Sequence, residues 1–370
     1  MLNDIFYKIN RKKMQCMGWI KSHKEPIVCP NNPIDFVVTW VDNNDLIWRE
    51  VKDDYLRDYV LQGNKDNGEE RYRDWELFKY WFRAVEQFAP WVNNVYLVTY
   101  GHIPMWLNTN NAKLKIVKHA EFIPKKYLPT FSSIPIELNL HRIDGLSDNF
   151  VYFNDDIILS KPVNPYDFFQ NNQPKYCAIA KPIKNDIENG SFQHQLFSVI
   201  GMINGYFYPR ISELIKNNSE KWFSYCYGKN IKYNLRAYDE NYIQGLYFSH
   251  LGVPFKKETF RKVWEVFEKE LDETCTHKFR MHQDIMHQIF SAWDILKGDF
   301  VSVSSTYYGK VFSNLSVQIE EIREALISKK YKMICLNDSK HISHDEYVIT
   351  KKRIIKIMEE LFPEKSKYEI

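Results

Sequence analysis

Short hydrophobic runs alternate with helical patterns over the first half of the chain. Runs rich in β-branched and aromatic residues predict strands at residues 34–41, 94–100, 114–117 and 150–153. Between the first two runs, large apolar residues recur at helical spacing from Leu77 to Phe88, which predicts an amphipathic helix over residues 75–89. This alternation favours a βαβ arrangement around a mainly parallel sheet.

The second half of the chain has a mainly helical pattern. Residues 190–298 contain many aromatic residues, whereas residues 302–312 and 331–336 predict short strands, and residues 311–329 and 349–362 predict helices. We therefore predict an α/β fold, Rossmann-like or GT-A-like, with a mainly parallel sheet and a helical insertion. Its parts should be a basic arm, an α/β part, the helical insertion and a C-terminal part that completes the domain, at residues 1–30, 31–189, 190–300 and 301–370.

Carboxylates directly follow two of the predicted strands. Asp42 comes after the first strand, and Asp155 and Asp156 come after the fourth. In open α/β sheets, ligands bind beyond the carboxyl ends of the strands, so these side chains could meet in one crevice. Adjacent carboxylates raise one another's pKa unless a cation compensates them, which indicates Mg²⁺ or Mn²⁺. A plain turn or helix cap is the alternative interpretation of the pair.

Several other polar residues allow both a structural and a functional interpretation. His250 follows an aromatic stretch and could be a core histidine. Arg280 and Asp284 have the spacing of an ion pair on the surface of a helix. Turn or helix-start positions with the same ambiguity are Arg71, Arg73, Arg142, Asn337 and Asp338.

Familiar nucleophile and phosphate-loop motifs are absent from the sequence. It contains no G-x-S-x-G, G-x-x-x-x-G-K-[ST] or G-x-G-x-x-G pattern, and it has only 13 glycines. Any bound phosphate must therefore be held by side chains, a metal or helix ends.

Composition is typical of a globular protein. The 370 residues are 44% hydrophobic and 16% aromatic, which is enough for a substantial core. The 50 Lys and Arg nearly balance the 47 Asp and Glu, and the formal charge of +3 argues against nucleic acid as a partner. No stretch approaches the ~18 apolar residues of a membrane span.

Cysteine spacing and the N-terminal sequence favour a cytoplasmic protein. The six cysteines lie far apart without a C-x-x-C pair, so neither a zinc site nor a disulfide framework is expected. The first 25 residues are basic but lack the apolar core of a signal peptide. This arm is either a solvated tail or a means of loose peripheral contact with anionic lipid at the cytoplasmic face of the inner membrane.

Four ordered blocks of the sequence resemble the characteristic regions of the Stealth family. They begin with DFVVTWVD at residues 35–42 and continue at residues 71–156, 250–284 and 335–369. His250 and Arg280 are 30 residues apart, which is the spacing in the family pattern. Gly252 stands where the family commonly has proline, so a different local turn is expected at His250. The family contains sugar-phosphate transferases of bacterial capsule synthesis and N-acetylglucosamine-1-phosphotransferase.

The resemblance implies a metal-dependent phosphotransferase. Such an enzyme transfers hexose-1-phosphate or N-acetylhexosamine-1-phosphate from a UDP-sugar to a hydroxyl of an oligosaccharide or lipid-linked saccharide. A phosphodiester forms and UMP is released, in the synthesis of capsular or other cell-surface polysaccharide. Mg²⁺ or Mn²⁺ would be held by Asp155, Asp156 and Asp338. The alternatives are a glycosyltransferase with a D-x-D-like metal site, which releases UDP, and a non-catalytic component of a capsule assembly complex.

The resemblance also implies roles for individual side chains. Arg280 would bind the transferring phosphate, and Asp284 would orient Arg280 or His250. His250 is the first choice of general base because an imidazole titrates near pH 6.5, and a carboxylate of Asp155 or Asp156 is the second choice. The catalytic set is therefore His250, Arg280, Asp284 and Asp156. Residues expected to contact the nucleotide sugar are Asp42, Arg71, Arg73, Arg142, Asn154 and Asn337.

Overall fold

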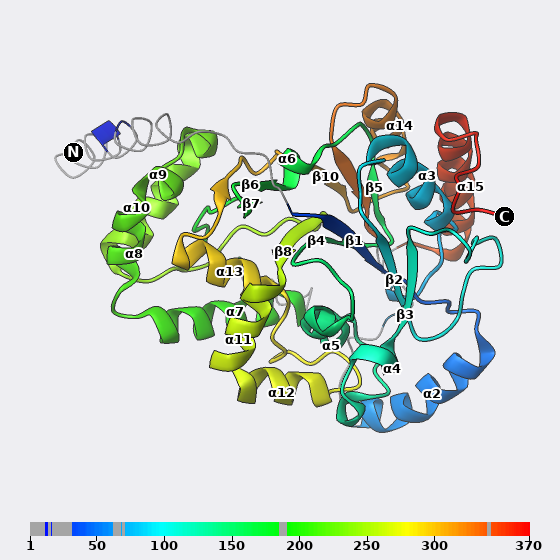
Figure 1. Ribbon diagram of the computed structural model, residues 1–370, viewed down its shortest axis with the longest axis horizontal. Coiled ribbons are helices and arrows are strands. Elements are labelled where there is room, and N and C mark those ends of the chain that lie inside the picture. Colours follow the sequence, from blue (N-terminus) through cyan, green and yellow to red (C-terminus); the bar gives the residue numbers. More distant parts are fainter. Residues whose placement is uncertain are drawn as a thin grey trace.

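A five-stranded sheet forms the centre of the molecule (Figure 1). The structure, a computed structural model, describes residues 12, 13, 16, 32–61, 68, 71–184, 191–338 and 342–370. The basic arm predicted at residues 1–30 lies outside the described residues except for residues 12, 13 and 16. In spatial order the strands are β3 (Leu114–Lys118), β2 (Val95–Thr99), β1 (Ile34–Thr39), β4 (Asn149–Asn154) and β8 (Val253–Lys256).

The central strand β1 pairs in parallel with both of its neighbours. Val38 pairs with Leu97 of β2 and with Phe153 of β4. β3 continues the parallel order, and β8 runs antiparallel to β4 at the edge. The predicted strands and the predicted mainly parallel α/β sheet are therefore confirmed. Both faces of such a sheet are covered, which explains why its strands have nearly continuous apolar sequences.

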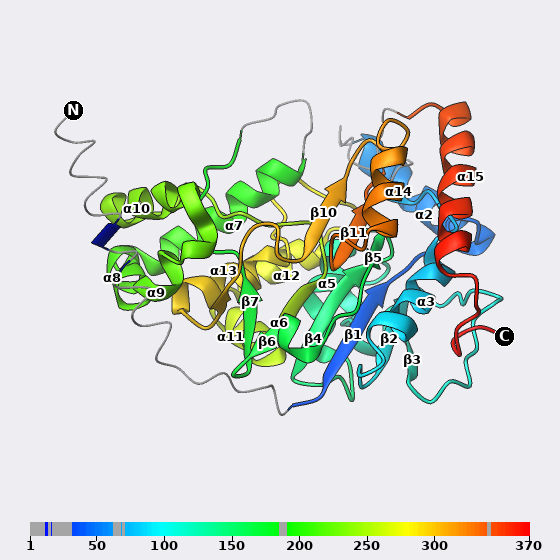
Figure 2. The same cartoon turned by 90° about the horizontal axis from the view of Figure 1, so that it is seen from above.

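Side chains of the sheet alternate between two hydrophobic cores. Val37 of β1 enters the first core, whereas Phe36 and Val38 enter the second. The two groups of helices lie on opposite sides of the strands (Figure 2). The first core includes α5 (Ser133–Asn139), α7 (Ser191–Phe207), α8 (Ile211–Asn217), α10 (Ile231–Glu240), α11 (Lys257–Val266), α12 (Glu268–Thr276) and α13 (Gln288–Lys297). The second includes α3 (Phe78–Phe88), α14 (Ile319–Ile327) and α15 (His344–Leu361).

Two three-stranded sheets flank the central sheet. In one, β11 (Met333–Leu336) pairs in parallel with β10 (Gly309–Phe312) and antiparallel with β5 (Ile157–Leu159). The other contains β6 (Phe169–Gln170), β7 (Gln173–Tyr176) and β9 (Val301–Ser302). Short helical segments are α4 (His119–Phe122), η2 (Lys125–Tyr127), η3 (Leu140–Arg142), α6 (Pro165–Phe168), α9 (Ser219–Trp222) and η4 (Tyr225–Asn230).

Several helix boundaries differ from the prediction. The helix predicted over residues 311–329 is only α14, because β10 occupies the start of that range. The last helix begins at His344, five residues earlier than predicted, because Ser343 caps it in a reciprocal capping box with Glu346. Within the described part of the chain, no helix has the length and apolar character needed to cross a membrane.

One long helix was not predicted at all. This helix, α2 (Leu46–Leu61), packs Trp48 and Tyr59 against Phe131 and Phe279, which come from loops far away in sequence. Its sequence is rich in charge, and the partners of its apolar face are not visible locally. The helix therefore depends on tertiary packing more than on its own amphipathic pattern.

Candidate active site

The turn between β4 and β5 carries the central carboxylates of the site. Asp155 and Asp156 form this turn directly after the carboxyl end of β4. The N–H of Leu336 donates to the carbonyl of Asp156 over 2.9 Å, because β11 pairs with β5. Asn337 and Asp338 therefore leave β11 beside the acidic turn.

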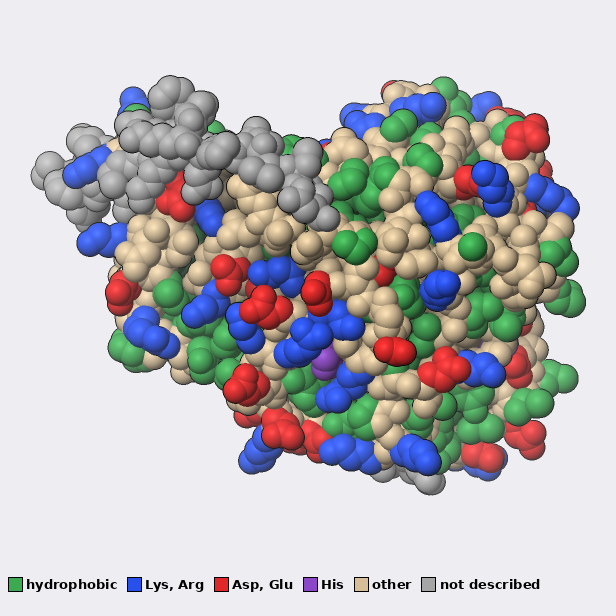
Figure 3. All heavy atoms as spheres, viewed as in Figure 1, with side chains coloured by type: hydrophobic (Ala, Val, Ile, Leu, Met, Phe, Trp, Pro, Cys, Tyr) green, Lys and Arg blue, Asp and Glu red, His purple; other side chains and the backbone are tan. Residues whose placement is uncertain are grey.

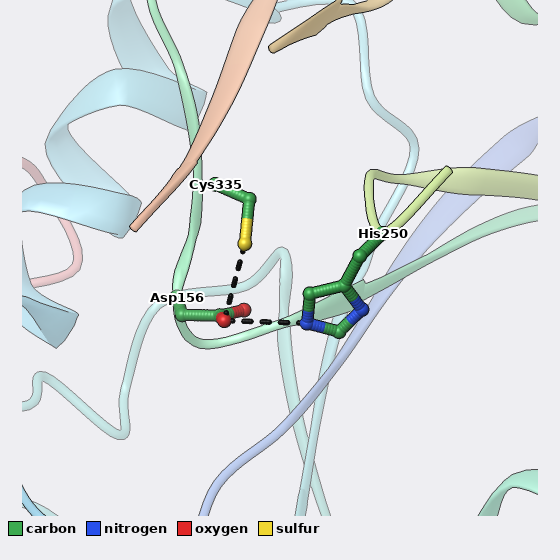
Figure 4. A group of neighbouring side chains, drawn as sticks. All are labelled: Asp156, His250 and Cys335. Atoms are coloured by element: carbon green, nitrogen blue, oxygen red, sulfur yellow. Dashed lines mark hydrogen bonds and ion pairs between the residues drawn. The ribbon is translucent and has the colours of Figure 1, made fainter. Parts of the chain in front are cut away.

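One oxygen of Asp156 contacts both an imidazole and a thiol (Figure 4). Its Oδ2 lies 3.3 Å from Nε2 of His250 and 3.2 Å from Sγ of Cys335. Burial by itself would raise the pKa of Asp156, but the contacts with His250 and Cys335 outweigh it, and the pKa is lowered. The other oxygen, Oδ1, is buried without a hydrogen-bond partner among the described residues.

His250 lies three residues before β8, and the turn that follows it requires glycine. A Cβ atom at Gly252 would lie 2.6 Å from the ring of Phe153. The N–H of Gly252 also contacts Sδ of Met333 at 3.2 Å. A proline there would clash with Phe153 and lose this contact, which explains the departure from the family pattern. The surrounding protein would lower the pKa of His250, but Asp156 outweighs this effect and raises it.

Asp155 lies among carboxylates. It remains open to solvent, yet the protein around it removes part of its hydration, which raises its pKa, and Asp156 and Asp74 add to the shift, to about 7. The pKa of Asp74 is raised by burial, and the charge of Asp42 contributes to that rise. The ends of β1 and β4 thus share an excess of negative charge, which a divalent cation would relieve.

Arg73 brings positive charge to one side of this group. Its Nη1 lies 3.3 Å from Oδ1 and 3.3 Å from Oδ2 of Asp338. The guanidinium also lies 5.0 Å from the ring centroid of Tyr347. A cation held by Asp338 would therefore have to share this carboxylate with Arg73. Arg71 precedes Arg73 in the same segment.

Arg280 and Asp284 lie on a loop between α12 and α13, so the helix predicted from their spacing is wrong. Asp284 is buried and accepts a hydrogen bond from the N–H of Met281 over 2.7 Å. Its other oxygen lies 2.6 Å from Nδ1 of His277. These bonds hold the loop that carries Arg280. The guanidinium of Arg280 donates to Oγ of Ser133 over 2.9 Å.

A buried chain of hydrogen bonds runs beside the site. The hydroxyl of Tyr152 lies 3.1 Å from Oγ1 of Thr39 and donates to Glu137 over 3.0 Å. The second carboxylate oxygen of Glu137 lies 2.7 Å from Nδ1 of His287. Burial would raise the pKa of Glu137, but His287 and Arg280 outweigh it and lower the pKa to about 2. This network joins the carboxyl ends of β1 and β4 to α5.

The sequence alone indicates no role for Glu137, His287 or Cys335. Glu137 and Cys335 lie inside the blocks that resemble the family, which was the available signal. His287 lies just beyond the third block, and its partner is 150 residues away. Each of these residues joins the site through a contact between segments that are distant in sequence.

Three predicted nucleotide-sugar residues lie at strand ends or directly after them. Asp42 comes after β1, and its N–H donates to Nε2 of His102 over 2.9 Å. Asn154 is the last residue of β4. The N–H of Asn337 donates to the carbonyl of Phe312 over 2.9 Å, directly after β11. The structure therefore brings these positions to the same edge of the sheets.

Arg142 lies elsewhere. It precedes β4, and the charges of Arg142, Arg261 and Lys257 act after burial to lower the pKa of His141 to about 3. Lys257 directly follows β8, whose end pairs with the start of β4. Figure 3 shows Lys and Arg side chains gathered over this region of α5 and α11. Arg142 thus belongs to a basic group near the amino end of β4, whereas Asp155 follows its carboxyl end.

A small cavity lies next to His250. Its volume is about 70 Å³, and its lining includes Ser249, Leu251, His287 and Gln288. Oε1 of Gln288 is a buried oxygen for which the described residues supply no hydrogen-bond donor. The cavity could therefore accept a small polar group of a ligand.

Two parts of the chain match family models. Residues 71–176 match Stealth protein CR2, conserved region 2, and residues 249–289 match Stealth protein CR3, conserved region 3. The chain is 42% identical over 339 residues to the capsular polysaccharide phosphotransferase WcwK of Streptococcus pneumoniae, covering 91% of this chain and 99% of that protein. It is 41% identical over 340 residues to the receptor polysaccharide phosphotransferase WefC of Streptococcus gordonii, with coverages of 91% and 99%.

Solved structures are much more distant. The galactosyltransferase LgtC in complex with donor and acceptor sugar analogs matches with a TM-score of 0.39 and 10% identity, covering 88% of this chain and 96% of that chain. The bifunctional glycosyltransferase WbbM matches with a TM-score of 0.34 and 10% identity, covering 88% and 50%. A likeness at this level carries no conclusion about the reaction.

Proposed function

The chain belongs to the Stealth family, and we propose that it transfers hexose-1-phosphate or N-acetylhexosamine-1-phosphate from a UDP-sugar to a hydroxyl of a saccharide acceptor. A phosphodiester would form and UMP would leave, in the synthesis of capsular or other cell-surface polysaccharide. Support comes from relatives that are named capsular, receptor and exopolysaccharide phosphotransferases. The observation that carries the proposal is the contact of Asp156 with His250 beside the uncompensated carboxylate of Asp155.

Asp155 and Asp156 fit a divalent cation such as Mg²⁺ or Mn²⁺. Asp156 offers a buried oxygen that no described residue bonds, and the pKa of Asp155 is raised by partial loss of hydration and by neighbouring negative charge. Carboxylate oxygens are the ligands that these hard cations prefer. Asp338 could complete the set if it turned from Arg73. When bound, the cation would neutralise charge on the diphosphate and on the leaving phosphate.

Arg280 is proposed to bind the phosphate that is transferred. Its guanidinium is held by Ser133, and its loop is held by Asp284, so the planar cation is positioned before substrate arrives. The charge of Arg280 also acts on His250 and opposes the rise of its pKa. Asp284 is therefore a positioning residue in this proposal.

His250 is proposed to accept the proton of the acceptor hydroxyl. Nε2 of the ring faces Asp156, which leaves Nδ1 as the atom that takes the proton. The carboxylate of Asp156 stabilises the imidazolium that forms, consistent with the raised pKa of His250. Because only the neutral ring is a base, transfer should slow as the pH falls below that pKa. A carboxylate of Asp155 or Asp156 is the second choice of base.

The nucleotide sugar is proposed to bind along the edge that follows β1, β4 and β11. Asp42, Asn154 and Asn337 lie there, and Arg71 and Arg73 approach from the segment before α3. The acceptor, free or lipid-linked, would approach the side of His250 where the cavity lies. Arg142 is left out of this proposal because it lies toward the other end of β4.

Phosphorus NMR combined with identification of the released nucleotide tests the reaction class. The protein is incubated with a panel of UDP-sugars, Mg²⁺ and acceptor oligosaccharides. A phosphodiester resonance in the product together with UMP supports the proposal. Release of UDP with a product that lacks phosphorus would identify a glycosyltransferase. Failure to bind Mn²⁺ or any nucleotide sugar in calorimetry would favour a non-catalytic role.

A further inference from the structure

Three different kinds of metal-binding atom meet at the acidic turn (Figure 4). Oδ2 of Asp156, Nε2 of His250 and Sγ of Cys335 all lie within 4.8 Å of one another. Two of the three separations are 3.3 Å and 3.2 Å. In a tetrahedral site with metal–ligand bonds of about 2.0–2.3 Å, neighbouring donors stand roughly 3.3–3.8 Å apart. Small side-chain rotations would therefore bring all three donors onto one ion.

The donors come from three separate segments with different exposure. Cys335 is fully buried on β11, which is held between β10 and β5. The side chains of His250 and Asp156 are 42% and 25% exposed. The thiol is thus held rigidly by the sheet, while solvent reaches the group from the side of His250. An ion could enter from that side without unfolding the sheet.

The chemistry of this set differs from that of an oxygen-lined site. Thiolate and imidazole ligands select Zn²⁺ and related thiophilic ions, whereas Mg²⁺ takes oxygen ligands. We propose that Asp156, His250 and Cys335 form a second cation site, selective for a thiophilic divalent ion such as Zn²⁺ or Cd²⁺. Three protein ligands leave a fourth coordination position open to water or to a substrate oxygen.

Occupation of this site would stop the proposed phosphate transfer, and this consequence rests on the proposed function. An ion bound to Nε2 of a neutral imidazole leaves the ring proton on Nδ1. The ring could then not accept the proton of the acceptor hydroxyl. The same ion would also hold Asp156 and so compete with the cation proposed to bind Asp155 and Asp156.

Titration of the full chain with Cd²⁺, followed by the ultraviolet charge-transfer absorption of a cadmium–thiolate bond, tests the site directly. The wild-type protein should show one such band that saturates at one equivalent and persists in excess Mg²⁺. Cys335→Ser should abolish the band and weaken Cd²⁺ binding at least ~10-fold, because a lost ligand costs at least as much as a lost supporting hydrogen bond. His250→Ala should weaken binding while Cys335 still contributes its thiolate.

Other cysteines require a matched control. The charge of Cys226 contributes to the raised pKa of Cys177, so these two thiols are the competing pair that the control must exclude. The double variant Cys177→Ser, Cys226→Ser should therefore keep the band and the affinity. A band that survives in Cys335→Ser, in protein with wild-type circular dichroism, or one that disappears in the double variant, overturns the site.

An inhibition assay tests whether an ion bound at Asp156, His250 and Cys335 stops phosphate transfer. In the phosphodiester assay with excess Mg²⁺, Zn²⁺ should inhibit the wild-type protein, and Cys335→Ser should raise the half-inhibitory concentration at least ~10-fold. Serine keeps an O–H donor toward Asp156, so this variant changes the metal ligand more than the local hydrogen bond. Cd²⁺ binding without inhibition by Zn²⁺ overturns the consequence alone. If no phosphodiester forms under any condition, the proposed function fails, and the absorption titration still decides the site.

Discussion

At the amino end of β1, the buried carboxylate of Asp35 accepts hydrogen bonds from the side chain of Asn93 and the N–H of Asn94, both over 2.9 Å, and from the N–H of Ser147 over 2.7 Å. At the carboxyl end of the neighbouring strand β4, Oδ1 of Asp156 is buried, and the described residues leave it without a donor. The pKa of the adjacent, solvent-exposed Asp155 is raised to about 7, chiefly because the surrounding protein removes part of its hydration and then by the charge of Asp156.

The difference between these two ends separates structural from functional carboxylates. A buried polar atom without a hydrogen bond costs about 1–3 kcal/mol, so a folded chain normally satisfies it. The amino end follows that rule at Asp35 with donors from two loops. The carboxyl end leaves Oδ1 of Asp156 without a donor among the described residues, beside the solvent-exposed carboxylate of Asp155. The contrast therefore indicates where a cation should bind.

Among the changes that test this difference, Asp156→Asn should have the largest effect on turnover. It keeps the shape of the side chain but removes one of the two adjacent charges and a ligand of the proposed cation. We expect turnover in the phosphodiester assay to fall at least ~10²-fold. The free energy of unfolding should fall only slightly, because the lost charged contact with His250, which lowers the pKa of Asp156, is partly offset by the relief of repulsion with Asp155. Turnover near that of the wild type would refute a catalytic role for this end of the sheet.

Asp35→Ala is the matched change at the opposite end. It leaves the N–H groups of Asn94 and Ser147 buried without an acceptor. We expect the free energy of unfolding, measured with urea, to fall by about 2 kcal/mol. Turnover per folded molecule should stay close to the wild-type value. A selective loss of turnover with unchanged stability would mean that the two ends do not divide their roles in this way.

The central sheet was predictable because its strands carry their own signal. Strands covered on both faces need apolar residues at successive positions, so β1, β2 and β4 are visible as local runs. α2 lacks such a signal because its apolar face is completed by Phe131 and Phe279 from distant loops. The spacing of Arg280 and Asp284 suggested a helix, but buried Asp284 bonds Met281 and holds a loop instead.

The site was predictable only in part for the same reason. Asp155 and Asp156 were found because they directly follow a predicted strand. Cys335 contacts Asp156 because β11 pairs antiparallel with β5, and no local sequence pattern predicts this pairing. The absence of a C-x-x-C motif argued against zinc, yet that argument covers only ligands that lie close in sequence. Glu137 and His287 were missed because they pair across 150 residues.

The next largest effect is expected in the pH dependence of cation binding at the carboxyl end of β4. With a pKa of about 7 in the absence of a cation, Asp155 is ionised above pH 7 and protonated below it. A bound cation requires the ionised form, so the affinity for Mn²⁺ should fall ~10-fold per pH unit below 7, or ~1.4 kcal/mol. Calorimetry at several pH values between 5.5 and 8 measures this slope. Asp155→Asn should bind weakly with a flatter slope, and an unchanged steep slope in that variant would assign the titration to another group.

The smallest effect on kcat/KM is expected for substitution of Arg142. This substitution tests whether the nucleotide-sugar site extends to the amino end of β4. The guanidinium of Arg142 donates to Asn139 over 2.8 Å and lies 5.0 Å from the ring centroid of Trp264, in the basic group around His141. Because no part of the proposed reaction reaches that group, Arg142→Ala should change kcat/KM for the UDP-sugar by less than ~3-fold, the scale of an ordinary surface substitution. Arg73→Ala at the carboxyl end removes the charge next to Asp338 and should lower kcat/KM at least ~10-fold. Equal losses in the two variants would extend the nucleotide-sugar site along β4 and remove the distinction between its ends.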